Sequence, residues 1–267
     1  MKVHHLNCGT MRPIATPGGL VCHVLLIETE RGLVLVDSGL GVHDARAPGQ
    51  RFGPGRFFVR PRFDPNEAAI NQIQRMGFDP HDVRHIVITH FDADHVGGLA
   101  DFPWAQVHLT RTEALAVQHP ATLIEKQRYL APHRAHGPRL VEHDPAASES
   151  WRGFAAAKEL TDITDGIVLI SLPGHTRGHA AIAVDAGDRW VLHAGDAFYH
   201  RGQLDDTNSA PKALTAMERM MAFDWPKVQA NHQHLSQLWS TAEPDVLLVN
   251  AHDPQLFERA LRTNPAQ

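Results

Sequence analysis

The sequence predicts a mixed fold of the α/β or α+β class, with buried sheet and helices outside it. Two observations predict this class: short apolar, β-branched runs open the chain and recur toward its end, and segments with a helical spacing of apolar residues lie among them. The chain has 267 residues, of which 43% are hydrophobic and 21% charged, so it can bury a full core. We therefore expect one domain over residues 1–267.

The first elements expected are two antiparallel strands. Residues 21–29 and 33–37 flank a short turn that contains Gly32, a pattern typical of a β-hairpin. A helix is expected over residues 66–76, where apolar residues share one helical face up to a glycine. A strand over residues 85–89 follows it.

The rest of the chain mixes both kinds of element. We expect helices over residues 110–119, 211–223, 226–239 and 254–261, and strands over residues 167–172, 181–184, 190–193 and 246–250. Pro211 and Pro226 suit the first turn of a helix. Residues 47–65 and 131–150, which are rich in proline, are expected to be irregular loops, and long loops in a compact domain are often lids or binding loops.

Charge and composition exclude several classes of function. A net charge of -5 and a pI near 6.5 give no global attraction to nucleic acid or anionic lipid, so any basic feature must be local. No signal peptide is recognisable, and no apolar run approaches the roughly 20 residues of a membrane helix. Cys8 and Cys22 are too few for a disulfide framework, although one bridge between them stays open. We expect a cytoplasmic protein with a small-molecule substrate and neither a nucleic-acid nor a membrane partner.

The most informative segment is residues 90–95, His-Phe-Asp-Ala-Asp-His, which follows an apolar strand and precedes two glycines. Imidazole nitrogens and carboxylate oxygens together suit divalent zinc, iron or manganese, and a cation offsets their crowded charge. Three more strand ends carry such side chains, namely His175 with His179, His193 with Asp196, and His252 with Asp253. Because strand ends can line one rim of a sheet, we expect these groups to converge on a metal site.

This pattern resembles the metallo-β-lactamase superfamily of hydrolases. The family pattern is His-x-His-x-Asp-His, then a His in a Pro-Gly-His-Thr turn, an Asp after a Gly, and a late His. It is matched in order by His90, Asp94, His95, His175, Asp196 and His252, and the resemblance extends from the Val-Asp-Ser-Gly turn at Asp37 to Asp253. Asp92 departs from the pattern, because the family usually has its second histidine there. The resemblance implies a four-layer αββα sandwich.

Carried onto this sequence, the resemblance implies two divalent metal ions, zinc in the first place and iron or manganese as alternatives. One would be held by His90, Asp92 and His175 and the other by Asp94, His95 and His252, with Asp196 as the bridge. Such ions lie about 3.5–4 Å apart and share a hydroxide that attacks the substrate. Asp92 replaces a neutral ligand by an anion, so we expect a harder site shifted toward iron or manganese. The alternative is that Asp92 only hydrogen-bonds a ligand histidine.

Four further residues are candidates for roles around the metals. Tyr199 follows Asp196 by three positions, a spacing similar to that of the lactonase branch, where a tyrosine hydrogen-bonds the substrate carbonyl. We expect its phenol to stabilise an oxyanion, and the alternative is an aromatic that fills space. For the proton that is transferred in the reaction, we expect the role to fall to Asp94 or to the metal that binds the released alkoxide. Asp37 is expected to orient a ligand or a loop, and His179 to cap the neighbouring turn.

Two groups of residues are open to a structural or a functional interpretation. Residues 51–63 hold four arginines and four phenylalanines with no acidic residue, and we favour a pocket wall or an interface, such as a homodimer contact, over a solvated loop. The chain has 20 histidines, so most are expected to be surface or structural residues. Those outside the metal pattern include His4, His5, His23, His232 and His234.

We expect a dinuclear metal-dependent hydrolase that acts on a lactone or a related carboxylic ester. A thioesterase of the glyoxalase II type is the alternative, because the same apparatus can cleave a thioester. A di-iron redox protein ranks lower: the flavodiiron branch has a glutamate at the Asp92 position but also a flavin domain, for which this chain has no suitable glycine-rich loop. A non-catalytic binding protein that contains metal also ranks lower. The negative net charge disfavours a nuclease.

Overall fold

Two β-sheets form the centre of the molecule in the computed structural model, which describes residues 1–145, 149–205, 209–241 and 245–263. The first sheet has the order β1-β2-β3-β4-β5-β6. Its strands are β1 (Lys2–Met11), β2 (Leu20–Thr29), β3 (Gly32–Val36), β4 (Val83–Val87), β5 (Gln106–Thr110) and β6 (Arg139–His143). The pairs β1·β2 and β2·β3 are antiparallel, whereas β3 to β6 run parallel.

The second sheet has the order β11-β10-β9-β8-β7. Its strands are β7 (Ala157–Glu159), β8 (Ile167–Ser171), β9 (Ala180–Asp185), β10 (Trp190–His193) and β11 (Val246–Val249). Strands β7 to β10 are antiparallel to their neighbours, and β11 is parallel to β10. The strand ends after β4, β8, β10 and β11 are those that carry the candidate metal ligands.

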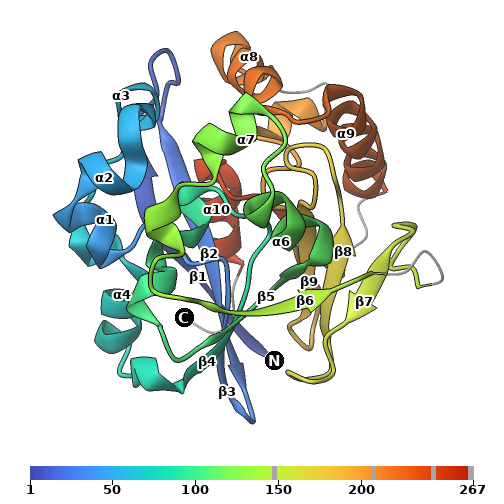
Figure 1. Cartoon of the computed structure of the whole chain (residues 1–267). Coiled ribbons are helices and arrows are strands. Elements are labelled where there is room, and N and C mark those ends of the chain that lie inside the picture. The colour runs from blue at the N-terminus through green and yellow to red at the C-terminus, as the bar shows by residue number, and fades with distance from the viewer. Residues whose placement is uncertain (146–148, 206–208, 242–244, 264–267) are drawn as a thin grey trace.

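Helices cover the outer faces of both sheets (Figure 1). They are α1 (Val42–Arg46), α2 (Pro48–Phe52), α3 (Arg56–Val59), α4 (Ala69–Arg75), α5 (Ala93–Val96), α6 (Arg111–Gln118), α7 (Leu123–Arg128), α8 (Lys212–Met221), α9 (Trp225–Ser240) and α10 (Pro254–Arg262). Ile73 of α4 and Val117 of α6 belong to the core on one side of the first sheet. Leu235 of α9 belongs to a second core, which packs on the second sheet. A third core lies between the two sheets and contains residues of both. This is the expected four-layer αββα sandwich.

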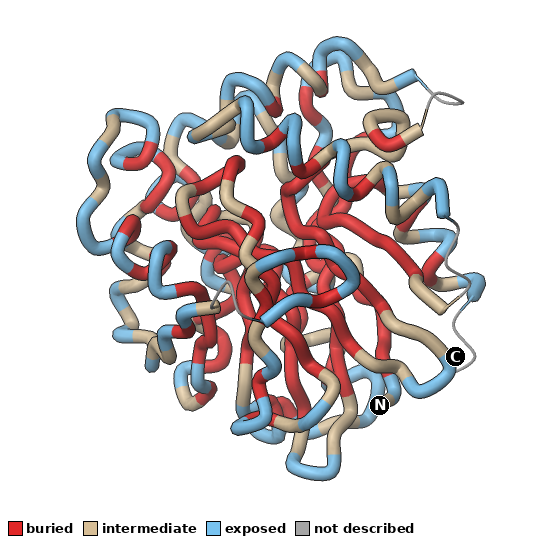
Figure 2. The backbone as a smooth tube through the Cα atoms, turned by 90° about the vertical axis from the view of Figure 1, so that its right-hand side faces the viewer, coloured by how far each residue is buried: buried red, intermediate tan, exposed pale blue. Residues whose placement is uncertain are grey.

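Buried residues run along the strands, and exposed residues lie on the helices and turns (Figure 2). The expected hairpin is present: Thr29 pairs with Gly32, whose φ of 123° only glycine adopts without strain. The predicted elements are confirmed to within about two residues at each end, apart from the helix expected over residues 66–76. There Asp64 caps a separate 3₁₀ turn, and the extended backbone of Ala68 delays the start of α4.

Several elements were not predicted. Strand β1 was missed because it shows no alternation of apolar and polar residues. Its His4 and His5 are buried, and their imidazoles contact Glu28 and His23. The expectation of irregular loops was wrong for part of both stretches, since residues 47–65 contain α2 and α3 and residues 131–145 contain β6. Strand β6 has little apolar patterning of its own and is held by parallel pairing along β5.

Two smaller findings bear on the composition. Cys8 and Cys22 are both free and buried, so no disulfide joins them. None of the helices in the described ranges is long and apolar enough to cross a membrane.

Candidate metal centre

The structure brings all seven candidate ligands together from connections that follow four strands. They are His90 and Asp92 in the loop after β4, Asp94 and His95 in α5, His175 after β8, Asp196 after β10, and His252 after β11. Asp92 occupies the position that begins α5, where an aspartate often caps the helix, yet its side chain makes no cap hydrogen bond. The carboxylate of Asp92 is turned toward the histidines instead.

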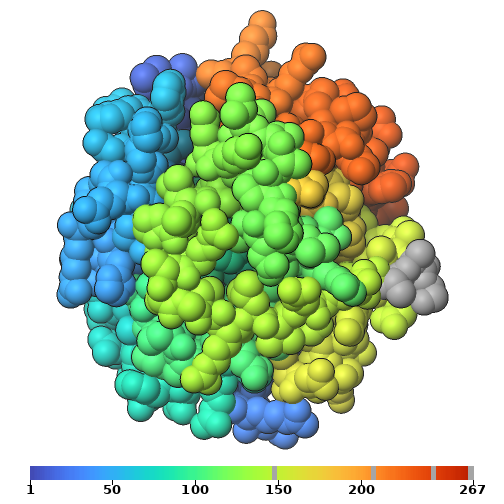
Figure 3. Space-filling view, viewed as in Figure 1, coloured from blue at the N-terminus to red at the C-terminus, as the bar shows by residue number. Residues whose placement is uncertain are grey.

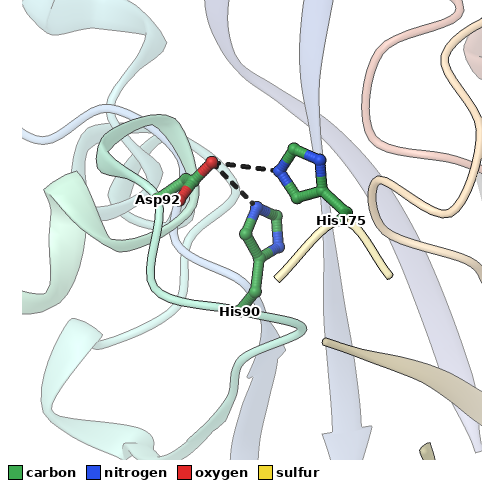
Figure 4. Close-up of side chains that lie close together, drawn as sticks. All are labelled: His90, Asp92 and His175. Atoms are coloured by element: carbon green, nitrogen blue, oxygen red, sulfur yellow. Dashed lines mark hydrogen bonds and ion pairs between the residues drawn. The ribbon is translucent and has the colours of Figure 1, made fainter. Parts of the chain in front are cut away.

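His90, Asp92 and His175 form a first group of potential ligands (Figure 4). Asp92 Oδ2 lies 3.1 Å from His175 Nε2 and 3.5 Å from His90 Nε2. All three side chains are buried. The carboxylate oxygen therefore faces two imidazole nitrogens from different loops.

Asp94, His95 and His252 form a second group. Asp94 Oδ2 lies 3.4 Å from His252 Nε2 and 4.0 Å from His95 Nε2. Asp196 lies between the two groups. Its Oδ1 is 3.2 Å from His95 and 3.1 Å from His252, and its Oδ2 is 3.5 Å from His175. One oxygen of Asp196 thus faces each group, as a bridging position requires.

Hydrogen bonds on the outer side orient the imidazoles. Asp37 accepts from the main-chain N–H and hydroxyl of Thr89, and its Oδ2 is 2.8 Å from His95 Nδ1. His252 Nδ1 lies 2.8 Å from the Val21 carbonyl oxygen. Asp37 has a φ of 58°, in the left-handed region, which aims its carboxylate at these partners. The expected contact between Asp37 and a candidate ligand is present, at His95.

His179 fixes the backbone on both sides of the centre. Its Nδ1 is 3.0 Å from the Leu172 carbonyl oxygen, and its Nε2 accepts a hydrogen bond of 2.9 Å from the Asp196 main-chain N–H. The expected cap of the loop over residues 173–178 is met only at its edge, since Leu172 directly precedes that loop, and the contact with Asp196 was not expected.

Glu113 is a buried residue that the sequence analysis missed. Its Oε1 accepts from the Phe91 main-chain N–H at 3.0 Å and from the Tyr129 hydroxyl at 3.2 Å. Its Oε2 accepts from the Thr176 hydroxyl at 2.7 Å and from the Gly178 main-chain N–H at 3.0 Å. Phe91 and Thr176 are neighbours of His90 and His175, so one carboxylate ties two ligand loops together. The spacing Thr-x-x-Glu was a signal, but it is typical of a helix cap and does not point to a distant loop.

The charges of the site are strongly coupled. Burial opposes the ionisation of Asp196, but His252 and His95 outweigh it and hold the pKa of Asp196 well below its ordinary value. Burial also disfavours the charged form of His252, yet Asp196 raises the pKa of His252 to about 9. Burial and the nearby Arg128 lower the pKa of His175 to about 4. Without a metal, protons on imidazoles balance the carboxylates of this centre.

The donor atoms fit a metal. His90 Nε2, His95 Nε2 and Asp196 Oδ1 are buried and have no hydrogen-bond partner among the residues that the structure describes. Buried polar atoms without partners are costly, whereas imidazole and carboxylate groups at these separations are suitable ligands for zinc, iron or manganese. Divalent cations would satisfy these atoms and replace the protons.

A cavity of about 740 Å³ opens beside this centre. Its walls come from the segment of α2 and α3, from α7 and from α8, which surround Asp92, Asp94 and Asp196. Figure 3 shows α7 exposed on the surface with the α1 to α3 segment on one side and α8 above. Phe52 and Phe58 line the cavity, so the expectation of a pocket wall within residues 51–63 is confirmed.

Tyr199 lines the same cavity, with its ring centroid 5.9 Å from that of His175 and 5.6 Å from that of His252. Burial and the neighbouring Asp196 raise the pKa of Tyr199, so the phenol keeps its proton. The other histidines have structural contacts. His4 contacts Glu28, His5 contacts His23, and His232 contacts Glu218, none of which belongs to the metal groups.

Comparison with known proteins assigns the family. The profile of the metallo-beta-lactamase superfamily matches residues 17–230, which is most of the chain. The chain belongs to the metallo-β-lactamase superfamily. Its resemblance to that superfamily, inferred from the metal motif, is confirmed.

Two relatives within the superfamily are informative. A probable metallo-hydrolase of Mycobacterium tuberculosis is 51% identical over 263 residues, which cover 98% of this chain and 84% of the relative. An N-acyl homoserine lactonase of Bacillus thuringiensis is 25% identical over 210 residues, or 75% of this chain and 74% of that protein. With the family, these relatives identify the chain as a metal-dependent hydrolase.

Solved structures agree with this fold. An N-acyl homoserine lactone hydrolase with N-hexanoyl-L-homoserine bound at its catalytic metal centre superposes with a TM-score of 0.65. It is 23% identical, and the match covers 97% of this chain and 95% of that one. The dizinc quorum-quenching lactonase AidC matches with a TM-score of 0.56 at 18% identity, over 88% of this chain and 73% of that one.

Proposed function

We propose that this member of the superfamily hydrolyses a lactone or a related carboxylic ester that carries an apolar group, using two divalent metal ions. The observation that supports this most is the convergence of seven ligands beside an apolar cavity. We assign His90, Asp92 and His175 to one ion, Asp94, His95 and His252 to the other, and Asp196 to the bridge. Because both sheets contribute ligands, we also propose that residues 1–267 form one domain.

Two divalent ions in this donor set would supply an ionised water as nucleophile and Lewis acidity toward the substrate carbonyl. The remaining roles belong to side chains of the chain itself. Tyr199, whose phenol keeps its proton, can donate a hydrogen bond to the carbonyl oxygen as negative charge develops there. Asp94 lines the cavity and can accept the proton that the nucleophile loses and pass it to the leaving alkoxide.

The cavity wall supports an apolar substrate group. Phe52, Phe58, Ile124, Met217 and Met220 all line it, and methionine side chains adapt to flexible chains. Similarity to N-acyl homoserine lactonases in sequence and in fold supports a cyclic ester as substrate. We propose zinc as the metal, in keeping with the dizinc lactonase among the structural neighbours.

The test is a hydrolysis assay on purified protein whose metal content has been measured. The panel contains lactones with short and long acyl chains, a thioester, a β-lactam and a phosphodiester. We expect turnover of lactones or esters, and loss of both metal and turnover in His175→Ala and Asp196→Ala. His81→Ala is the matched control, because that side chain is 73% exposed and outside the centre.

Two results would contradict the proposal. Turnover confined to the phosphodiester or the thioester would remove the ester assignment. Full activity and full metal content in Asp196→Ala would remove the bridging assignment.

A further inference from the structure

Arg128, the last residue of α7, places a buried positive charge against a proposed metal ligand. Its Nη1 donates to the His175 carbonyl oxygen at 2.9 Å, and its Nη2 donates to the Met221 carbonyl oxygen. Its Nε lies 3.3 Å from Asp92 Oδ1, and neither of these two atoms has a hydrogen-bond partner in the described part of the chain. Arg128 is therefore held between a carboxylate and two backbone carbonyls.

A buried guanidinium at this place is unfavourable on its own. It cannot lose its proton, and it would repel a divalent cation at His90 and His175. Among the described residues, Asp92 is the one carboxylate within 4.0 Å of the Arg128 guanidinium. Asp92 also stands where the superfamily usually has a neutral histidine. The carboxylate that departs from the family pattern is therefore the one that contacts the buried Arg128 guanidinium.

We propose that Asp92 and Arg128 act together as one neutral unit that replaces a histidine ligand. Asp92 Oδ2 faces the metal position with His90 and His175, while Oδ1 faces Arg128. With this pairing, the charge at the centre equals that of a relative with histidine at position 92. The proposal replaces the expectation of a harder site shifted toward iron or manganese, which counted Asp92 as an uncompensated anion. It rests on the proposed metal site.

Arg128→Met separates this role from a purely structural one. Removing the guanidinium leaves Asp92 buried without its cation, so the melting temperature of the metal-free protein falls. It also removes a positive charge that repels the metal, so zinc affinity rises by about tenfold or more. Arg128→Lys keeps the positive charge but loses the planar guanidinium that donates to two carbonyl oxygens at once. Its metal-free melting temperature falls too, while its zinc affinity stays within about threefold of the wild type.

Arg51 offers a matched control. It is equally buried, and it likewise contacts one carboxylate, Asp44, and two backbone carbonyls, those of Gly97 and Pro132. Asp44 belongs to neither metal group. Arg51→Met should therefore lower the metal-free melting temperature without raising zinc affinity.

The measurements are zinc affinity by competition with a chromophoric chelator and melting temperature after the metal has been removed. Asp92→His alone should bind zinc more weakly than Asp92→His combined with Arg128→Met, which restores the usual neutral ligand. Unchanged or weaker zinc binding in Arg128→Met would overturn the proposal and leave Arg128 as a scaffold residue. A wild-type protein that binds no zinc would instead contradict the proposed function, so the two failures are distinguishable.

Discussion

Replacing Glu113 by glutamine should weaken the whole centre although Glu113 is not a proposed ligand. The carboxylate accepts four hydrogen bonds, two of them from main-chain N–H groups of the ligand loops. A glutamine amide keeps one accepting oxygen and turns an N–H₂ group toward donors. The Thr176 hydroxyl can rotate to accept from that group, but the Gly178 N–H cannot.

The magnitude follows from these contacts. A hydrogen bond to a charged group contributes about 1.5–3 kcal/mol, and a buried donor left without a partner costs about 1–3 kcal/mol. The two effects overlap, so we expect Glu113→Gln to lower the free energy of unfolding of the metal-free protein by about 2–4 kcal/mol. Tyr129→Phe removes one of the four donors and should cost only about 1 kcal/mol.

The assay is urea denaturation of metal-free protein, followed by zinc titration of each variant. We expect Glu113→Gln to lose zinc affinity as well as stability, because His90 and His175 lose their common anchor. Tyr129→Phe should keep wild-type zinc affinity. A loss of stability below about 1 kcal/mol in Glu113→Gln, or a large loss with unchanged zinc affinity, would refute the reasoning that one carboxylate positions both loops.

Four further outcomes are expected. Tyr199→Phe should lower kcat by about 10²–10³-fold with metal content unchanged, as measured by lactone hydrolysis beside metal analysis. Zinc binding to the metal-free protein at pH 7 should release protons, because Asp196 raises the pKa of His252 to about 9; calorimetry in buffers of different ionisation enthalpy measures this release. Burial raises the pKa of Asp101 to about 6, above the usual pKa of an aspartate, so the ionisation of Asp101 destabilises the fold as the pH rises through this range. In urea denaturation, Asp101→Asn should therefore increase the free energy of unfolding by about 1–3 kcal/mol at pH 8 and leave it unchanged near pH 4. Met217→Trp should raise KM for long-chain esters and leave that for short ones unchanged.

The convergence of the candidate ligands was predictable because its signal is local in the sequence. Residues 90–95 combine a strand end with a dense group of donors, and each later candidate ligand also follows an apolar strand. The pocket wall was predictable from the four phenylalanines of residues 51–63, which are costly to leave in water. The hairpin and the long helices were predictable from the periodic spacing of apolar residues, which is also a local signal.

The missed features depend on contacts between distant parts of the chain. Glu113 lies on α6, and only the packing of that helix against two loops reveals its role. Arg128 ends a short helix that was not predicted, and its partner Asp92 is 36 positions earlier in the sequence. Strand β1 is polar in sequence, and its His5 is accommodated by a contact with His23 that no local pattern shows.

Anomalous diffraction from crystals of zinc-loaded protein tests the proposed dinuclear site most directly. The account predicts two zinc peaks, one among His90, Asp92 and His175 and the other among Asp94, His95 and His252, with Asp196 between them. A single peak, or peaks away from these side chains, would contradict it.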